Sequence, residues 1–127
     1  MTIVIGCGSL KGTEPAPAKD LYQGNLFTSA RAAAERDGRP WLIISARYGL
    51  LDPNTVIEPY NQRLVTKADA RRLGVLIATQ ANRPLAVEAW CAGLYADAMR
   101  QGGIRVSEPL ANLGIGHRKH FFKEHAA

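Results

Sequence analysis

The sequence predicts a single α/β domain over residues 1–127, built in three layers, with a four-stranded, mainly parallel sheet and helices on both faces. Short aliphatic runs alternate along the chain with segments of helical periodicity, and glycine or proline bounds most of them. Crossovers of this length form right-handed βαβ units, which produce parallel pairing. A chain of 127 residues with 46% hydrophobic residues is long enough for one core and too short for two.

Composition narrows the classes of function. The chain carries 16 Lys and Arg against 11 Asp and Glu, a formal net charge of +5, which favours a nucleotide or nucleic acid as partner. Two cysteines make no disulfide framework and no signal-peptide pattern opens the sequence, so we expect a cytoplasmic protein. No apolar run reaches the roughly 18 residues of a membrane helix, which predicts that the protein has no membrane partner.

The first strand is the β-branched run 2–5, and the glycine-rich loop 6–13 follows it. Glycines let backbone amides point at an anion, hydroxyl groups can donate to it, and Lys11 supplies charge. The loop fits neither the Walker motif nor the dinucleotide fingerprint. We predict that it binds phosphate or carboxylate through Cys7, Gly8, Ser9 and Lys11; the alternative is a plain glycine turn.

Capping signals mark the first helices. Residues 25–37 form a helix with Asn25 as N-cap, which Gly38 ends. The apolar run 40–45 is the second strand. Thr66, with Asp69 three residues later, matches a capping box for a helix that runs to about residue 82.

The remaining elements continue the alternation. Residues 85–91 form strand three, 93–100 a helix, 104–110 strand four and 117–125 a short basic helix. We expect the strand order 2-1-3-4, whose switch point places the loops after strands one and three beside a crevice. Because strand three contains Glu88 among apolar residues, we expect that carboxylate to lie on an edge, in solvent.

The long segment 46–65 collects polar and aromatic side chains just past strand two. Loops of this length in compact domains are usually functional or disordered, and its apolar residues predict that this one is packed down. Arg47 could pair with a phosphate, while Tyr48 could stack on a base or donate its hydroxyl. The alternative is that Tyr48 covers the core and Arg47 is solvated.

Two carboxylates of the same segment, Asp52 and Glu58, suit glycosidic cleavage. In that chemistry one carboxylate stabilises positive charge at the anomeric carbon and the other handles a proton. Asp52 precedes a proline, so the alternative for it is a turn-forming role. Their spacing in the sequence does not reveal their separation in space.

Three more residues are candidates for the same crevice. Gly93 and Tyr95 open the helix after strand three and could present an amide and a hydroxyl. Arg118 belongs to the basic final helix, which suits phosphate. His117 and His120 have a spacing seen in metal sites, but no third ligand accompanies them, so we expect neither metal nor cofactor.

Four motifs together resemble a family of small uncharacterised α/β domains from bacteria and their phages. They are C-G-x-x-K at residue 7, A-x-x-L-Y-x-G-x-L-F at 18, S-A-x-Y-G-L-L at 45 and I-x-P-Y at 57. Family members commonly have Ser in place of Gly6 and further lysines near Lys11. The resemblance implies nucleotide or nucleic-acid metabolism and, by analogy with small α/β enzymes, the breaking or exchange of N-glycosidic bonds.

The leading hypothesis is therefore an enzyme that removes or exchanges the base at an N-glycosidic bond of a nucleotide or nucleic acid. The alternatives are a non-catalytic nucleic-acid-binding module and a phage or bacterial protein-interaction factor. The base, the choice between free nucleotide and polymer, and the oligomeric state are left open. The predicted catalytic residues are Glu58, Asp52 and Tyr48, and the predicted phosphate- or substrate-binding residues are Cys7, Gly8, Ser9, Lys11, Ser45, Arg47, Tyr60, Gly93, Tyr95 and Arg118.

Overall fold

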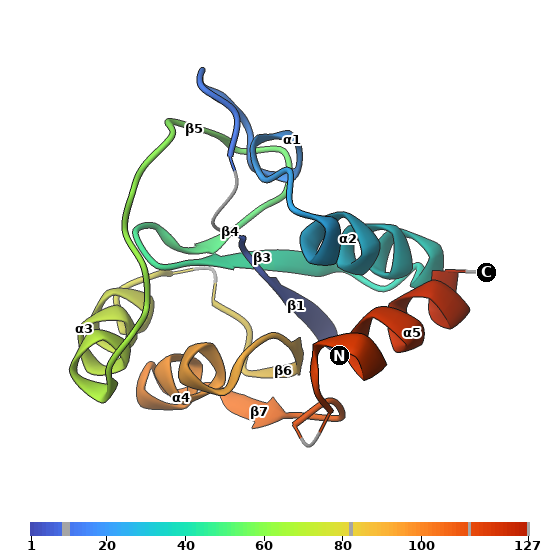
Figure 1. Cartoon of the computed structure of the whole chain (residues 1–127). Coiled ribbons are helices and arrows are strands. Elements are labelled where there is room, and N and C mark those ends of the chain that lie inside the picture. Colours follow the sequence, from blue (N-terminus) through green and yellow to red (C-terminus); the bar gives the residue numbers. More distant parts are fainter. Residues whose placement is uncertain (9–10, 82, 112, 127) are drawn as a thin grey trace.

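In the computed structural model, which describes residues 1–8, 11–81, 83–111 and 113–126, helices cover both faces of a five-stranded sheet (Figure 1). Its order is β4-β3-β1-β6-β7, and neighbouring strands from β3 to β7 pair in parallel. The strands are β1 Thr2–Gly6, β3 Trp41–Ser45, β4 Gly49–Leu51, β6 Ala86–Trp90 and β7 Arg105–Ser107.

The sheet differs from the predicted four strands in number and order, because the chain adds β4 beyond β3. β4 runs antiparallel to β3 and starts at Gly49, whose φ of 74° is strained for other residues. Three residues are too few to show alternation in a sequence. The outer edge of β4 is paired, since the Gln80 side chain accepts from the Leu50 amide at 2.9 Å and donates to the Leu50 carbonyl at 3.1 Å.

Helices α2 and α5 pack together on one face of the sheet, and α3 and α4 pack on the other (Figure 1). The bounds are α1 Ala18–Leu21, α2 Asn25–Asp37, α3 Lys67–Ala78, α4 Gly93–Gln101 and α5 Ile115–Ala126. No helix in the described part of the chain is long and apolar enough to cross a membrane.

The predicted capping box of α3 is confirmed, whereas the bounds of several helices differ from the prediction, α5 for example starting at Ile115 and not at residue 117. Thr66 Oγ1 accepts from the Asp69 amide at 3.1 Å, and the Asp69 carboxylate accepts from the Thr66 amide at 3.0 Å. α3 nevertheless ends at Ala78, well before residue 82. The N-cap of α2 is Gly24, not Asn25, which is already helical.

The segment 46–65 is packed against the connector that follows the first loop. A small antiparallel sheet joins β2 Ala16–Pro17 to β5 Val56–Ile57. The side chain of Ile57 is buried beneath it. This pairing holds the segment close to the carboxyl end of β1.

The prediction that Glu88 lies on an edge is wrong, because β6 lies between β1 and β7. The Glu88 carboxylate accepts from the Trp90 indole at 2.7 Å and from Arg39 at 3.3 Å. Arg39 also binds Asp37, whose other carboxylate oxygen lies 2.7 Å from His125 of α5. The hydrogen bonds from Arg39 and His125 hold the pKa of Asp37 well below its usual range. The network therefore ties the end of α5 to the sheet.

Candidate functional site

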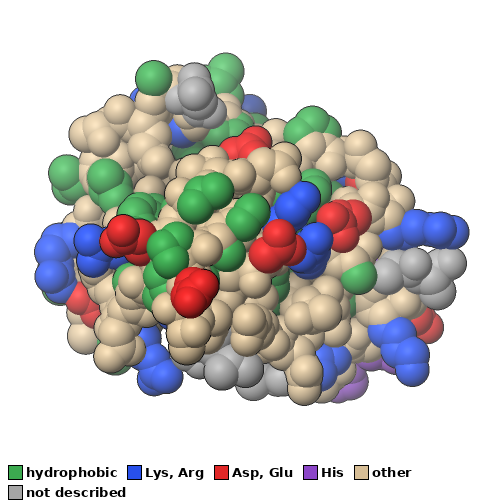
Figure 2. Space-filling model, turned by 90° about the horizontal axis from the view of Figure 1, so that it is seen from above, with side chains coloured by type: hydrophobic (Ala, Val, Ile, Leu, Met, Phe, Trp, Pro, Cys, Tyr) green, Lys and Arg blue, Asp and Glu red, His purple; other side chains and the backbone are tan. Residues whose placement is uncertain are grey.

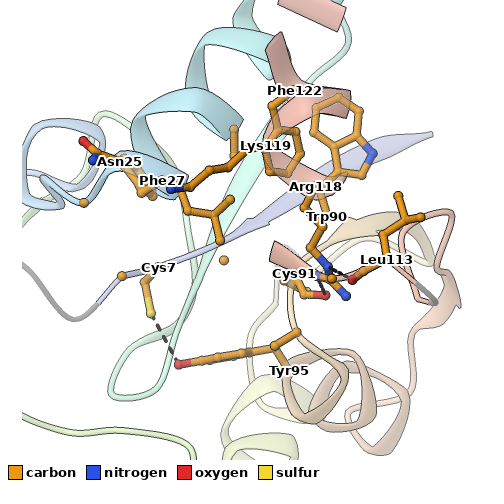
Figure 3. A pocket seen from close by; sticks show the side chains of 17 residues that line it. Cys7, Asn25, Phe27, Trp90, Cys91, Tyr95, Leu113, Arg118, Lys119 and Phe122 are labelled. Carbon is orange, nitrogen blue, oxygen red and sulfur yellow. Dashed lines mark hydrogen bonds between the residues drawn. The ribbon is translucent and has the colours of Figure 1, made fainter. Parts of the chain in front are cut away.

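A cavity of about 620 Å³ opens at the carboxyl ends of β1 and β6. Its walls are the loops after those strands and the first turns of α2, α4 and α5 (Figure 3). β1 leads into α2 on one face of the sheet and β6 leads into α4 on the other, so the cavity lies at a switch point. Ligands of open α/β sheets bind at this position.

Helix N-termini supply the cavity with backbone donors. The N-caps of α2 and α4 are Gly24 and Ala92, and neither provides a side-chain cap. Both line the cavity, as does Gly114, which precedes α5. The first amides of a helix have no partner within the helix and carry partial positive charge. Three such helix starts around one cavity suit an anion.

Two cations of α5, Arg118 and Lys119, also line the cavity. The Arg118 guanidinium donates to the carbonyls of Leu113 at 2.9 Å and Cys91 at 3.0 Å, which fixes it between α5 and the end of β6 (Figure 3). These bonds use two of its five donors. Within the described ranges, no Asp or Glu lines the cavity, so its charged groups are all positive.

This positive charge is local. Figure 2 shows Lys and Arg side chains mixed with Asp and Glu over one face of the molecule, not gathered into a single basic patch. The net charge of +5 alone therefore does not identify a binding surface on that face. The charges that line each cavity therefore indicate a binding site better than the net charge does.

Aromatic side chains form the apolar part of the cavity wall. Phe27, Trp90 and Phe122 line it, and the rings of Trp90 and Phe122 lie 5.8 Å apart between centroids. All three residues are buried, which makes the wall rigid. At 2–3% exposure these rings offer only their rims to the cavity, which gives a flat ligand such as a nucleobase an apolar surface but no open ring face for stacking.

Cys7 and Tyr95 face each other at the mouth of the cavity. The Cys7 sulfur lies 3.5 Å from the Tyr95 hydroxyl (Figure 3). Burial and the nearby Cys7 raise the pKa of Tyr95 far above its usual value, so this hydroxyl stays protonated and can donate. Cys91 also lines the cavity, but burial raises its pKa to about 12, which makes it a poor nucleophile.

A hydroxyl cluster, made of Ser45, Tyr22 and Tyr60, lies beside Cys7. Ser45 is 0% exposed; its Oγ donates to the Tyr60 hydroxyl at 2.7 Å, which lies 2.5 Å from the Tyr22 hydroxyl. Burial raises the pKa of Tyr22 to about 12 and raises the pKa of Tyr60 further, with Cys7 adding to both shifts. The Lys11 ammonium lies 4.4 Å from the centre of the Tyr60 ring. The tyrosines are therefore neutral groups that can exchange hydrogen bonds but do not act as bases.

The structure divides the predicted binding residues between two neighbouring places. Cys7, Gly8, Tyr95 and Arg118 line the cavity, whereas Lys11, Ser45 and Tyr60 belong to the hydroxyl cluster or contact it. Tyr48 packs its ring edge-on against Tyr60 at 5.5 Å. Gly93 is the exposed first residue of α4, beside the lining residue Ala92. Ser9 lies outside the described residues.

Arg47, Asp52 and Glu58 lie away from the 620 Å³ cavity. Arg47 lines a separate hollow of about 100 Å³. Asp52 lines a third cavity next to β4, and its carboxylate accepts from the Asn54 amide at 2.9 Å, which is the turn-forming role. Glu58 is exposed, and its backbone carbonyl accepts from the Tyr48 hydroxyl at 3.5 Å. The structure thus does not bring the two carboxylates together in one cavity.

Several residues of the cavity were not singled out from the sequence. The motif L-Y-x-G-x-L-F contains a usable signal, because Gly24 leaves the start of α2 without a side-chain cap. Lys119 follows Arg118 in the basic helix and could have been included with it. Nothing in the local sequence distinguishes Trp90 and Phe122 from ordinary core residues, since only the packing of α5 on the end of β6 places them at a cavity.

Comparison with known proteins identifies a family but no activity. The sequence profile of a family described as "Family of unknown function (DUF6884)" matches residues 2–124 of the chain. This match is consistent with the resemblance to an uncharacterised family that the motifs indicate. No curated protein matches the chain.

Proposed function

The chain belongs to the DUF6884 family of unknown function, and we propose that it binds a nucleotide unit in the 620 Å³ cavity and acts on the N-glycosidic bond of that unit. One observation carries the proposal: three helix starts, two cations and an aromatic wall meet at one cavity. The helix starts and the two cations suit a phosphate, and the aromatic wall suits a base. The volume lies within the range of about 300–1,000 Å³ of small-molecule sites.

Binding divides between the two sides of the cavity. The phosphate lies against the amides that follow Gly24 and Ala92, with Lys119 and Arg118 beside it. The base lies in the apolar part of the cavity, against the partly exposed Leu26 and Leu113 and the rim of the buried Trp90. The sugar then lies near Cys7 and Tyr95, whose thiol and hydroxyl are the polar groups at the mouth.

The glycosidic reaction requires a carboxylate or water held near the anomeric carbon. The Glu58 carboxylate does not line the cavity, and its segment contacts the hydroxyl cluster through Tyr60 and Tyr48, so we propose that Glu58 acts from that side by positioning the attacking water. Asp52 is the weaker candidate, since its carboxylate already holds a turn. The protonated tyrosine hydroxyls would donate to the leaving base.

Replacing Lys119 tests the binding site. Lys119→Glu should weaken the binding of 5′-nucleotides about 10- to 100-fold, because a charge-assisted hydrogen bond contributes about 1.5–3 kcal/mol and the new carboxylate repels phosphate. Titration calorimetry measures the change. Lys123→Glu is the matched control: it makes the same charge change one turn later on α5, at an exposed position outside the cavity lining. Equal weakening by both variants would show a general charge effect and no phosphate site.

Replacing Glu58 tests the reaction. Glu58→Gln should lower the rate of base release about 10²- to 10⁴-fold and leave nucleotide affinity unchanged. The assay incubates the protein with a panel of ordinary and modified nucleotides and with DNA, and detects free base by mass spectrometry. Glu124→Gln, an exposed carboxylate on α5, is the control. Full activity of Glu58→Gln would remove Glu58 from the reaction, and binding without base release by the native protein would favour the non-catalytic module.

A further inference from the structure

A second basic hollow lies beside the bend that follows Ser45 of the hydroxyl cluster. Its volume is about 100 Å³, and its walls are the bend after β3, residues 62–64 and the face of α3 that carries Asp69, Arg72, Leu73 and Leu76. Three arginines from these three segments line it: Arg47, Arg63 and Arg72. The hollow is smaller than the roughly 300–1,000 Å³ of small-molecule sites, a size that suits a single charged group such as a phosphate.

The charge of this hollow is not balanced. Asp69 is the carboxylate that lines it, and Asp69 forms an ion pair with Arg72. The same carboxylate accepts from the backbone amides of Val65 and Thr66, and these hydrogen bonds lower its pKa. No carboxylate of the described residues lies within ion-pair distance of Arg47 or Arg63. Within the described ranges, the guanidinium groups of Arg47 and Arg63 therefore have no acidic partner.

The bend that carries Arg47 has a defined shape. Ser45 Oγ accepts from the amides of Arg47 and Tyr48 at 3.2 and 3.1 Å, and the guanidinium carbon lies 5.5 Å from the centre of the Tyr48 ring. The Ser45 hydroxyl is in turn held by Tyr60. An exposed arginine at the end of a strand does not require such support, whereas a phosphate-binding arginine gains from it because less side-chain freedom is lost on binding.

The two hollows are reached from neighbouring strand ends. The Cys7 amide donates to the Ile44 carbonyl at 3.2 Å, so the mouth of the large cavity and the bend after β3 follow adjacent strands. Adjacent strands lie about 4.8 Å apart. Lys11 and the ring of Tyr60 lie beside these strand ends. In the proposed function the phosphate of a mononucleotide already lies in the large cavity, so a ligand that also fills the arginine-lined hollow needs a second phosphate group.

From this arrangement we infer that the substrate of the proposed site is a single-stranded nucleic acid. One nucleotide occupies the large cavity, with its base unstacked against the aromatic wall, and the phosphate of a flanking nucleotide binds Arg47 and Arg63. A paired base would first have to be flipped out of its stack at a cost of a few kcal/mol, which favours single strands as the ligand. The inference rests on the proposed nucleotide site and deepens it by naming the polymer as the ligand.

The test compares ten-nucleotide single strands with the matching 5′-mononucleotides. Fluorescence anisotropy follows 5′-labelled strands of each base, and calorimetry follows the mononucleotides. The double variant Arg47→Ala/Arg63→Ala should bind the strands at least about tenfold more weakly and keep its mononucleotide affinity. The slope of log affinity against log salt should fall by about 0.7, the value for one single-strand phosphate contact. Retained mononucleotide binding also shows that the variant is folded.

The control is Arg83→Ala/Arg105→Ala, which removes the same charge from two exposed positions away from the second hollow. Equal weakening of strand binding by both double variants would overturn the inference, as would a native protein that binds strands no more tightly than mononucleotides. In either case mononucleotide binding persists and the proposed function stands. A native protein that binds neither ligand overturns both proposals.

Discussion

A Phe122→Ala variant is expected to lose about 3–5 kcal/mol of unfolding free energy and, with it, nucleotide binding. Phe122 is 2% exposed, and its ring packs against Trp90 at 5.8 Å and Phe121 at 5.7 Å. Truncation of a buried phenylalanine removes its transfer free energy and leaves a void in the core. The same helix carries Arg118 and Lys119, so its loosening displaces both cations from the cavity. Chemical denaturation followed by far-UV circular dichroism measures the first effect, and calorimetry with nucleotides measures the second.

Two further variants separate the effect of losing buried volume at residue 122 from the effect of any substitution in α5. Phe122→Leu keeps most of the apolar volume and should cost less than about 1.5 kcal/mol. His120→Ala changes the same helix at an exposed residue whose ion pair with Glu124 lies in solvent, and should change stability by about 0.5 kcal/mol or less. Native-like stability of Phe122→Ala would mean that α5 does not seal the cavity wall.

A Ser45→Ala variant is expected to lose about 2–4 kcal/mol of unfolding free energy. The hydroxyl is 0% exposed, accepts from the amides of Arg47 and Tyr48, and donates to Tyr60. Each buried polar group left without a partner costs about 1–3 kcal/mol, and part of that cost is recovered where water reaches the exposed side of the bend. The affinity for single strands should also fall, because Arg47 loses the turn that orients it.

Its controls are chosen to isolate this hydroxyl. Ser107→Ala removes an exposed hydroxyl from β7 and should change stability by about 0.5 kcal/mol or less. Tyr60→Phe leaves both backbone amides bonded to Ser45 and should cost less than Ser45→Ala. If urea denaturation gives Ser45→Ala the stability of the native protein, Ser45 does not hold the bend and the support for Arg47 is lost.

Local patterns were sufficient to predict most of the secondary structure. Ile3 and Ile5 face the core beneath α2 while Val4 faces the core beneath α3, so a strand buried on both faces reads as a continuous apolar run. The pair Thr66 and Asp69 marked the start of α3, because a capping box depends only on residues three apart. β4 and the pairing of Glu88 were missed, since both depend on partners that are distant in the sequence.

The cavity residues predicted from the sequence either directly follow a strand or belong to a helix that starts at the cavity, as Tyr95 and Arg118 do. Cys7 and Gly8 line the cavity because they continue β1 past its carboxyl end, which the strand prediction already implies. Arg47 also follows a strand, yet it enters a different hollow, because the bend held by Ser45 turns it toward α3. The positions of Asp52 and Glu58 could not be predicted either. Both lie in an irregular segment, which has no periodicity from which the direction of a side chain can be inferred.

By itself, the sequence determined an α/β arrangement with a glycine-rich turn after β1 and a basic helix near its end, because burial and capping impose short-range patterns on a chain. Tertiary structure alone decided that the starts of α2, α4 and α5 surround one cavity and that three arginines form another hollow. Both arrangements depend on the direction of each crossover connection. They also depend on contacts between residues far apart in the sequence, such as the hydrogen bond from Arg118 to the Cys91 carbonyl.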